Sequence, residues 1–405
     1  MRGVRLLAIG GSLALASLGS APPAMAGQVA QPQAQRFAAA PCALQQTGSP
    51  ASEMTTPPWP QEKLNFIDAW NRTRGRGVKV AVLDSGVDGS HPQLRGRVKA
   101  YDATNSGTPQ DCLGHGTRVA GIIAAEDLRR NNIAFVGVAP EATIISIKTA
   151  VTGRGDDPRF VANGIRRATD LGAKIINLSS QSPNFEDLKA AVEYAQRKDV
   201  LIIAAAGNLE DKNQTAQKAY PANYDGVMSV GGTNPDGTLA DFTNSETHVT
   251  ITGPGKDIIS TWPRGAYFNE SGTSFAAPYV AGTAALVRAY HPKLTAAQVK
   301  DRIERTADGG TVKGTGAGLV NPLRAVTAVL GTGGTGATGG VPAQPAVRQV
   351  SIDRPQEVDH FGRGLALSMA GGALIVAIAV GVAGAVVPMS RRRNGAARST
   401  EPTPR

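Results

Sequence analysis

Residues 78–83, Val-Lys-Val-Ala-Val-Leu, form a short apolar and β-branched run that leads directly into Asp84. A strand inside a parallel sheet is covered on both faces, so its sequence is almost continuously hydrophobic instead of alternating. The run therefore predicts a buried strand of a parallel sheet. The carboxylate of Asp84 is expected at its carboxyl end, where functional loops of such sheets lie.

Similar buried runs recur along the chain and alternate with segments of helical spacing. The other runs that predict buried strands are residues 142–147, 174–178, 200–205 and 227–230. The apolar stripes that predict helices between them are Val161, Ile165, Ala168 and Leu171, and then Leu188, Ala191, Val192 and Ala195. This alternation predicts an α/β fold with a doubly wound, mostly parallel sheet and helices on both faces.

The predicted globular unit ends near Leu330. Two helices close it, one over about residues 275–290 and one after Thr295, which is a good N-cap residue. Residues 331–364 begin with a run of Gly, Thr and Ala and continue with several prolines, a composition typical of flexible tethers. We therefore predict one peptidase-sized domain over residues 61–330, followed by a linker.

The first residues have the features of a secretory signal. Arg2 and Arg5 precede an apolar stretch over residues 6–18, and Ala-Met-Ala at residues 24–26 supplies the small side chains typical of a cleavage site. This pattern predicts export, with a signal peptide over residues 1–26. The alternative is an N-terminal membrane anchor that is never cleaved.

A long apolar segment lies near the other end of the chain. Residues 365–388 are almost entirely Leu, Ala, Gly, Ile and Val, and at about 1.5 Å per residue they can cross a hydrocarbon layer of about 30 Å. Three arginines follow at residues 391–393. Positive residues beside a span remain cytoplasmic. We therefore predict a single-pass protein of the cell membrane, with a transmembrane helix at 365–388, a cytoplasmic tail at 389–405 and an extracytoplasmic catalytic domain.

The two cysteines, Cys42 and Cys112, both fall in the part predicted to be exported. Thiols tend to be oxidised in that environment, so we predict a disulfide between them, with two free thiols as the alternative. Cys42 belongs to residues 27–60, an extension rich in Ala, Gln, Pro, Ser and Thr that is too poor in aliphatic side chains to build its own core. The disulfide would join this extension to the loop before His115.

Composition argues against several other classes of protein. The net charge of +10 is not gathered into a lysine-rich stripe with interleaved aromatic residues, so we expect no nucleic-acid partner. No metal-ligand spacing, phosphate-binding loop or dinucleotide fingerprint occurs, and no cofactor or metal is expected. Asp156 and Asp157 are interpreted as a solvated loop, with a calcium site as the alternative.

Three side chains of the types used in nucleophilic catalysis stand beside glycines, namely Asp84, His115 and Ser274. A serine hydroxyl is a weak nucleophile until a base removes its proton. His115 can be that base near neutral pH, and a buried carboxylate can hold its imidazole in the required tautomer. The chain order Asp, His, Ser is the subtilisin order, which differs from the orders of chymotrypsin and the α/β-hydrolases.

The motifs around these residues resemble those of the subtilases, the S8 family of serine proteases. The matching segments are residues 84–87 (Asp-Ser-Gly-Val), 114–117 (Gly-His-Gly-Thr), 205–208 (Ala-Ala-Gly-Asn) and 272–278 (Gly-Thr-Ser-Phe-Ala-Ala-Pro). The resemblance implies a serine endopeptidase that acts on proteins or peptides through an acyl-enzyme. It also implies Asp84, His115 and Ser274 as the catalytic triad.

The same resemblance assigns further roles. Asn208 and the backbone N–H of Ser274 would form the oxyanion hole. Leu178, Ser179 and Ser180 would contribute to substrate binding, although the glycines that usually follow in the family are replaced here. Arg118 stands where many relatives carry a second histidine, and we expect no part for it in proton transfer.

Among subtilases, the layout most resembles the mycosins, which are membrane-anchored proteases associated with type VII secretion. They share a signal peptide, a cross-linked extension, a Gly/Pro-rich tether, one C-terminal span and a short tail. The resemblance implies limited proteolysis close to the membrane, with a type VII secretion membrane complex as a partner. The alternative is a structural protein that stabilises such a complex and whose proteolysis is dispensable.

Overall fold

The computed structural model divides the chain after Gly331 into two units, and every residue that the structure describes lies in the first. The described residues are 44, 46–152, 157–209, 217–310 and 312–330. The predicted signal peptide (1–26), linker (331–364), membrane span (365–388) and tail (389–405) lie outside them. Within the described residues, no helix combines the length and the hydropathy needed to cross a membrane.

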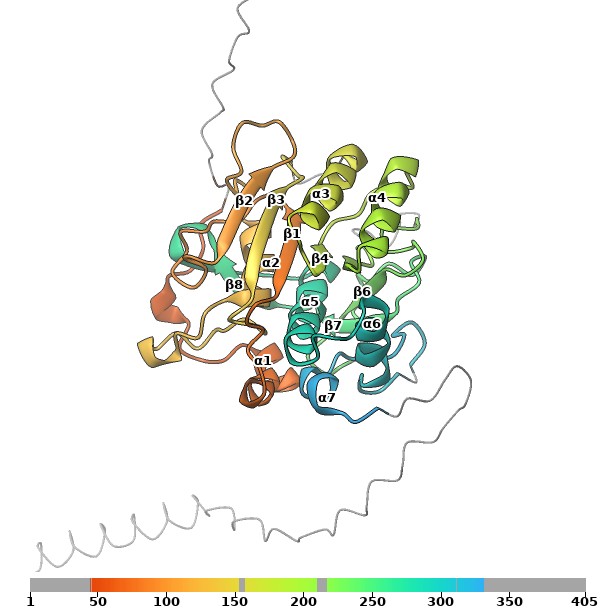
Figure 1. The fold of residues 1–405 in the computed structure, drawn as a ribbon. Helices are drawn as coiled ribbons and strands as arrows, with labels where there is room; N and C mark the ends of the chain where they lie inside the picture. The colour runs from red at the N-terminus through yellow and green to blue at the C-terminus, as the bar shows by residue number, and fades with distance from the viewer. Residues whose placement is uncertain (1–43, 45, 153–156, 210–216, 311, 331–405) are drawn as a thin grey trace, which may run out of the picture. The chain divides into compact units, whose positions relative to one another are not determined.

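A seven-stranded sheet forms the centre of this unit, with β1 in its interior (Figure 1). All neighbouring strands pair in parallel, in the order β2-β3-β1-β4-β5-β6-β7. The strands are β1 Lys79–Asp84, β2 Val98–Asp102, β3 Thr143–Lys148, β4 Ile175–Leu178, β5 Leu201–Ala205, β6 Met228–Thr233 and β7 Ile251–Pro254. The predicted α/β class and all five predicted buried strands are confirmed.

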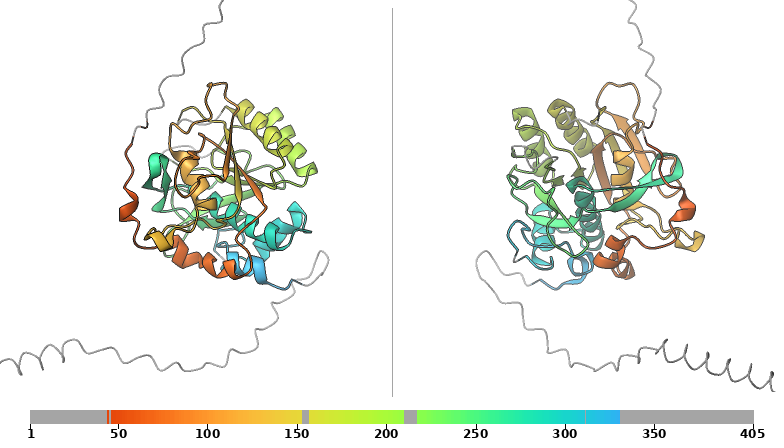
Figure 2. Two further views of the ribbon diagram at one scale, coloured as in Figure 1. Left: turned by 60° about the vertical axis from the view of Figure 1, so that its left-hand side comes forward. Right: turned by 180° about the vertical axis from the view of Figure 1, so that it is seen from behind.

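Helices cover both faces of the sheet, as the views in Figures 1 and 2 show. The helices α3 Pro158–Asp170 and α4 Glu186–Arg197 cover one face, and α2 His115–Ala124 and α5 Thr273–Tyr290 cover the other. Successive side chains of β1 alternate between these layers, because a strand has a side-chain period of two. Val80 and Val82 pack in the layer of α2 and α5, and Ala81 and Leu83 pack in the layer of α3 and α4.

Local capping chemistry fixes several helix ends. Thr295 begins α6 Ala296–Arg305, and its hydroxyl accepts a hydrogen bond from the backbone N–H of Gln298, whose side chain in turn accepts from the Thr295 backbone N–H. This capping box confirms the predicted helix start.

The shorter helices are α1 Trp59–Leu64 and α7 Pro322–Thr327, with 3-10 turns at Ala51–Glu53, Phe66–Asn71, Arg129–Asn131 and Pro263–Gly265.

An antiparallel hairpin, β8 Ile258–Trp262 and β9 Ala266–Glu270, leads the chain into α5. The N-terminal extension adds to its edge, because Ser49 N–H donates to Tyr267 O at 2.7 Å and Tyr267 N–H donates to Ser49 O at 2.9 Å. The sequence patterns did not predict this hairpin. It matters for the site, because β9 ends four residues before Ser274.

Candidate active site

The fold brings Asp84 and His115 together. Asp84 is the last residue of β1, and His115 is the first residue of α2. Imidazole Nδ1 lies 2.8 Å from Asp84 Oδ1 and 2.9 Å from Oδ2. The Asp84 side chain is 4% exposed and the His115 side chain is 30% exposed. Because a carboxylate only accepts hydrogen bonds, Nδ1 carries the proton and Nε2 is left with its lone pair.

Opposing effects set the pKa of His115. Burial disfavours the charged imidazolium and lowers the pKa, whereas the negative charge of Asp84 and its hydrogen bond raise it. The charge of Arg118 lowers the pKa further, and that of Glu270 raises it. The net result is a pKa above the usual 6.5. The neutral form of His115, which can accept a proton, therefore becomes dominant only above this raised pKa.

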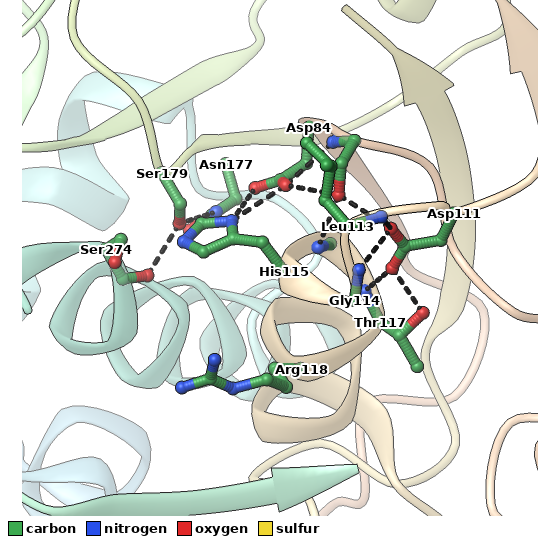
Figure 3. Close-up of polar contacts among 12 residues, drawn as sticks. Asp84, Asp111, Leu113, Gly114, His115, Thr117, Arg118, Asn177, Ser179 and Ser274 are labelled. Carbon is green, nitrogen blue, oxygen red and sulfur yellow. Dashed lines mark hydrogen bonds and ion pairs between the residues drawn. The ribbon is translucent and has the colours of Figure 1, made fainter. Parts of the chain in front are cut away.

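Ser274 lies in the first turn of α5, on the other side of the imidazole from Asp84 (Figure 3). The Ser179 hydroxyl donates to the backbone carbonyl of Ser274 at 2.7 Å and so ties the end of β4 to this turn. Among the described residues, no hydrogen bond joins Ser274 Oγ to His115. Such bonds are often long before substrate binds and shorten in the complex.

Asn208 is oriented by the residue before the serine. Its Oδ1 accepts hydrogen bonds from Thr273 N–H at 2.9 Å and from Thr273 Oγ1 at 2.8 Å, so Nδ2 is the end left to donate elsewhere. A Cβ at Gly272 would lie 3.0 Å from Ser274 Oγ and 3.1 Å from Asn208 Nδ2. The absence of a side chain at Gly272 therefore keeps the space between hydroxyl and amide open for a small oxygen atom.

A second buried carboxylate, Asp111, holds the start of α2. It accepts hydrogen bonds from Ser85 Oγ at 2.8 Å, Gly114 N–H at 2.8 Å, and Thr117 N–H and Oγ1 at 2.9 and 2.6 Å. Burial raises the pKa of Asp111. The sequence analysis missed this residue, although an acidic side chain before a helix start is a capping signal. Its effect is to fix the turn that carries His115.

These residues open into one cleft with a volume of about 880 Å³. The predicted residues that line it are Asp84, His115, Ser179, Ser180, Asn208 and Ser274. Leu178 does not line it, because its side chain is 0% exposed and packs in the core layer of α3 and α4. Ser179 and Ser180 line the cleft, and the role of residues 178–180 in substrate binding stays a prediction. Residues that line the cleft and were not predicted include Arg118, Ala150, Val151, Thr152, Trp262 and Glu270.

Cys112 also lines the cleft. Its predicted partner, Cys42, lies outside the described residues, so that pairing stays a prediction. Asp157 caps α3 by accepting a hydrogen bond from the Arg159 N–H, and Asp156 lies outside the described residues. In the part of the chain that the structure describes, no three His, Cys, Asp or Glu side chains are grouped so that they could hold a metal ion.

The order Asp, His, Ser on a parallel sheet defines the class of subtilisin-like serine endopeptidases, since the other serine hydrolase folds present the same groups in other orders. The comparison of sequences agrees: the subtilase family profile matches residues 75–329, and the chain belongs to that family. It is 40% identical over 235 residues to the intracellular serine protease of Paenibacillus polymyxa, an alignment that covers 56% of this chain and 71% of that one.

Among solved structures, this chain is similar to those of mycosins. The crystal structure of MycP1 from Mycobacterium smegmatis is 28% identical, with a TM-score of 0.63, over 72% of this chain and 90% of that one. The MycP3 protease from the type VII (ESX-3) secretion system is 34% identical, with a TM-score of 0.59, over 71% and 91%. The predicted resemblance to mycosins is confirmed, and the protein is a subtilisin-family serine endopeptidase.

Proposed function

We propose that the chain hydrolyses peptide bonds through an acyl-enzyme, with Ser274 as nucleophile, His115 as general base and acid, and Asp84 as the orienting carboxylate. The observation that carries this proposal is the pair of short contacts from both Asp84 oxygens to one imidazole nitrogen. They direct the basic Nε2 away from Asp84, and Ser274 lies on that side of the ring (Figure 3).

Each step has a residue in this site. His115 Nε2 takes the proton of Ser274 Oγ while the oxygen attacks the substrate carbonyl carbon. The oxyanion that forms accepts hydrogen bonds from Asn208 Nδ2 and the Ser274 backbone N–H. His115 then returns its proton to the leaving amine as the peptide bond breaks, and a water molecule attacks the acyl-enzyme by the same sequence. We assign Ser179 and Ser180 to the acyl side of the substrate.

We further propose that this protease acts outside the cell, anchored in the membrane by residues 365–388, and that it serves type VII protein secretion. The first part rests on the signal-like and apolar segments of the sequence. The second rests on similarity to MycP1 and MycP3, which come from the ESX-1 and ESX-3 type VII secretion systems.

A fluorophosphonate probe tests the proposed nucleophile directly. We expect the full-length protein to be labelled at one residue, with the added mass located by peptide mapping on Ser274. The hydroxyl becomes reactive because His115 removes its proton, so the Ser274→Ala variant is expected to remain unlabelled. Labelling of the variant at the wild-type rate, or folded wild type that does not react, would contradict the assignment.

Asn208→Ala is expected to lower kcat by about 10²- to 10³-fold with little change in KM, since the oxyanion exists only after attack begins. Removal of the equivalent amide donor from subtilisin has an effect of this size on kcat. Steady-state hydrolysis of a quenched peptide measures the loss.

The Asn208→Asp variant is the control for local structure. It keeps an oxygen that can accept from Thr273, removes the amide donor and adds a negative charge that repels the oxyanion. We expect it to melt like the wild type and to lose at least as much kcat as Asn208→Ala. If Asn208→Asp retained wild-type kcat, Asn208 would have no role in oxyanion stabilisation.

A further inference from the structure

A buried cation lies in the wall of the cleft. The Arg118 side chain is 2% exposed, and its Cζ lies 4.1 Å from the ring centroid of Phe275 and 5.2 Å from that of Phe268. In the described part of the chain, Nε and Nη2 of Arg118 have no hydrogen-bond partner. Aromatic faces and one carboxylate, Glu270, therefore hold this guanidinium in place.

Glu270 forms the exposed half of this ion pair. It is the last residue of β9, it accepts from Arg118 Nη1, and it lines the same cleft as Ser274. Its side chain is 53% exposed. A molecule that enters the cleft thus meets the carboxylate, while the positive charge stays behind it. The ion pair also limits the motion of Glu270, because its partner is fixed by packing.

Few other charges reach the surface of the cleft. Of the described residues that line it, only Asp84, His115, Arg118 and Glu270 have side chains that can carry a full charge near neutral pH. Asp84 is buried behind the imidazole, and Arg118 is buried behind Glu270. The exposed formal charge that a bound peptide encounters among these residues is therefore negative, and it favours a nearby cation.

The position of Glu270 indicates which part of the substrate it meets. In Figure 3, Ser179 and Arg118 lie on opposite sides of the His115 imidazole. Glu270 accepts a hydrogen bond from Arg118 and lines the same cleft as Ser179 and Ser180. The acyl half of the substrate is assigned to Ser179 and Ser180. The leaving half therefore continues past His115, because His115 must protonate the amine of the leaving peptide. Glu270 then lies on the leaving-group side.

We propose that Glu270, fixed by Arg118, selects substrates with Lys or Arg within the first two residues after the cleaved bond. This inference rests on the proposed function, because it assumes attack by Ser274 and the assignment of the acyl side. It adds a substrate class, namely polypeptides that are basic just after the cleavage site.

A set of internally quenched peptides tests the inference with the full-length protein. The peptides share one acyl half and carry Lys, Ala or Glu at the first two leaving-group positions. We expect kcat/KM for Lys to exceed that for Ala by about fivefold, the upper range for a partly exposed ion pair, and Glu to be the poorest. The preference should shrink as salt is raised, because exposed charges are screened.

Three variants locate the source of the preference. Glu270→Gln keeps the shape and removes the charge, so the Lys and Ala peptides should become equal. Because this leaves the Arg118 charge buried without its partner, the double variant Arg118→Met, Glu270→Gln replaces the whole pair with uncharged groups and should also show no preference. Glu62→Gln, which removes an exposed carboxylate on α1, should keep the fivefold ratio.

The outcomes separate this inference from the proposed function. If wild type cleaves the Ala peptide but shows no preference for Lys, or prefers Glu, the role of Glu270 is wrong while the protease assignment stands. A preference for Lys that survives in both Glu270 variants also overturns the proposed role of Glu270. If folded wild type cleaves none of the peptides and resists the fluorophosphonate, the proposed function fails and the inference fails with it.

Discussion

Ser274→Ala is expected to lower kcat by about a million-fold, the loss seen when the nucleophile of subtilisin is removed. The hydroxyl is the only part of the residue that changes. Its backbone carbonyl still accepts from Ser179, and its backbone N–H remains at the start of α5. Turnover of a quenched peptide, measured together with the melting temperature, should show lost activity on an intact fold.

Ser271→Ala is the matched control for this result. Ser271 stands three residues earlier in the same segment, where its hydroxyl accepts from the backbone N–H of Asp257 and not from the groups around His115. We expect kcat to change by no more than a few-fold. If Ser274→Ala kept more than about one hundredth of wild-type activity in a preparation free of contaminating protease, another residue would have to be the nucleophile.

The central sheet could be predicted because its signal is local. In β1, every residue after Lys79 is buried, so the run of apolar side chains is visible without knowledge of its neighbours. Asp84 and His115 were also found from short motifs, since each stands at the end of an element where such motifs occur. The distance between them required the fold, because 31 residues separate them in the chain.

The hairpin could not be predicted in the same way. β9 has an exposed end and a mixed sequence, and the backbone partners of Tyr267 include Ser49 from the distant extension. The pair of Arg118 and Glu270 is separated by 152 residues, so neither charge indicates the other in the sequence. Arginine is also rarely buried, so the position of Arg118 three residues after His115 gives no sign of an ion pair in the cleft.

Leu178 shows a limit of carrying a motif over as a whole segment. Neighbouring side chains of a strand point to opposite faces, so a segment at a strand end divides between core and cleft. Leu178 ends β4 and turns into the apolar layer, whereas Ser179 follows the strand and reaches Ser274. The motif indicated this strand end, but only the fold assigned each side chain to a face.

Asp84→Asn is expected to lower kcat by about 10⁴-fold while Ser274 and Asn208 remain in place. An amide can donate as well as accept, so it can stabilise the tautomer of His115 that carries its proton on Nε2, and that form cannot accept a proton from Ser274. The amide also lacks the charge that stabilises the imidazolium. Single-turnover acylation at neutral pH measures the loss.

The pH dependence distinguishes this role from a general loss of structure. In the wild type, Asp84 raises the pKa of His115 above 6.5 against the opposing effect of burial, so kcat/KM should rise with pH through a midpoint above 6.5. Asp84→Asn removes the charge and leaves the burial, so the residual activity should rise through a lower midpoint. Residual activity of Asp84→Asn that rises through the wild-type midpoint would contradict this account, because Asp84 would then not be acting on the imidazole.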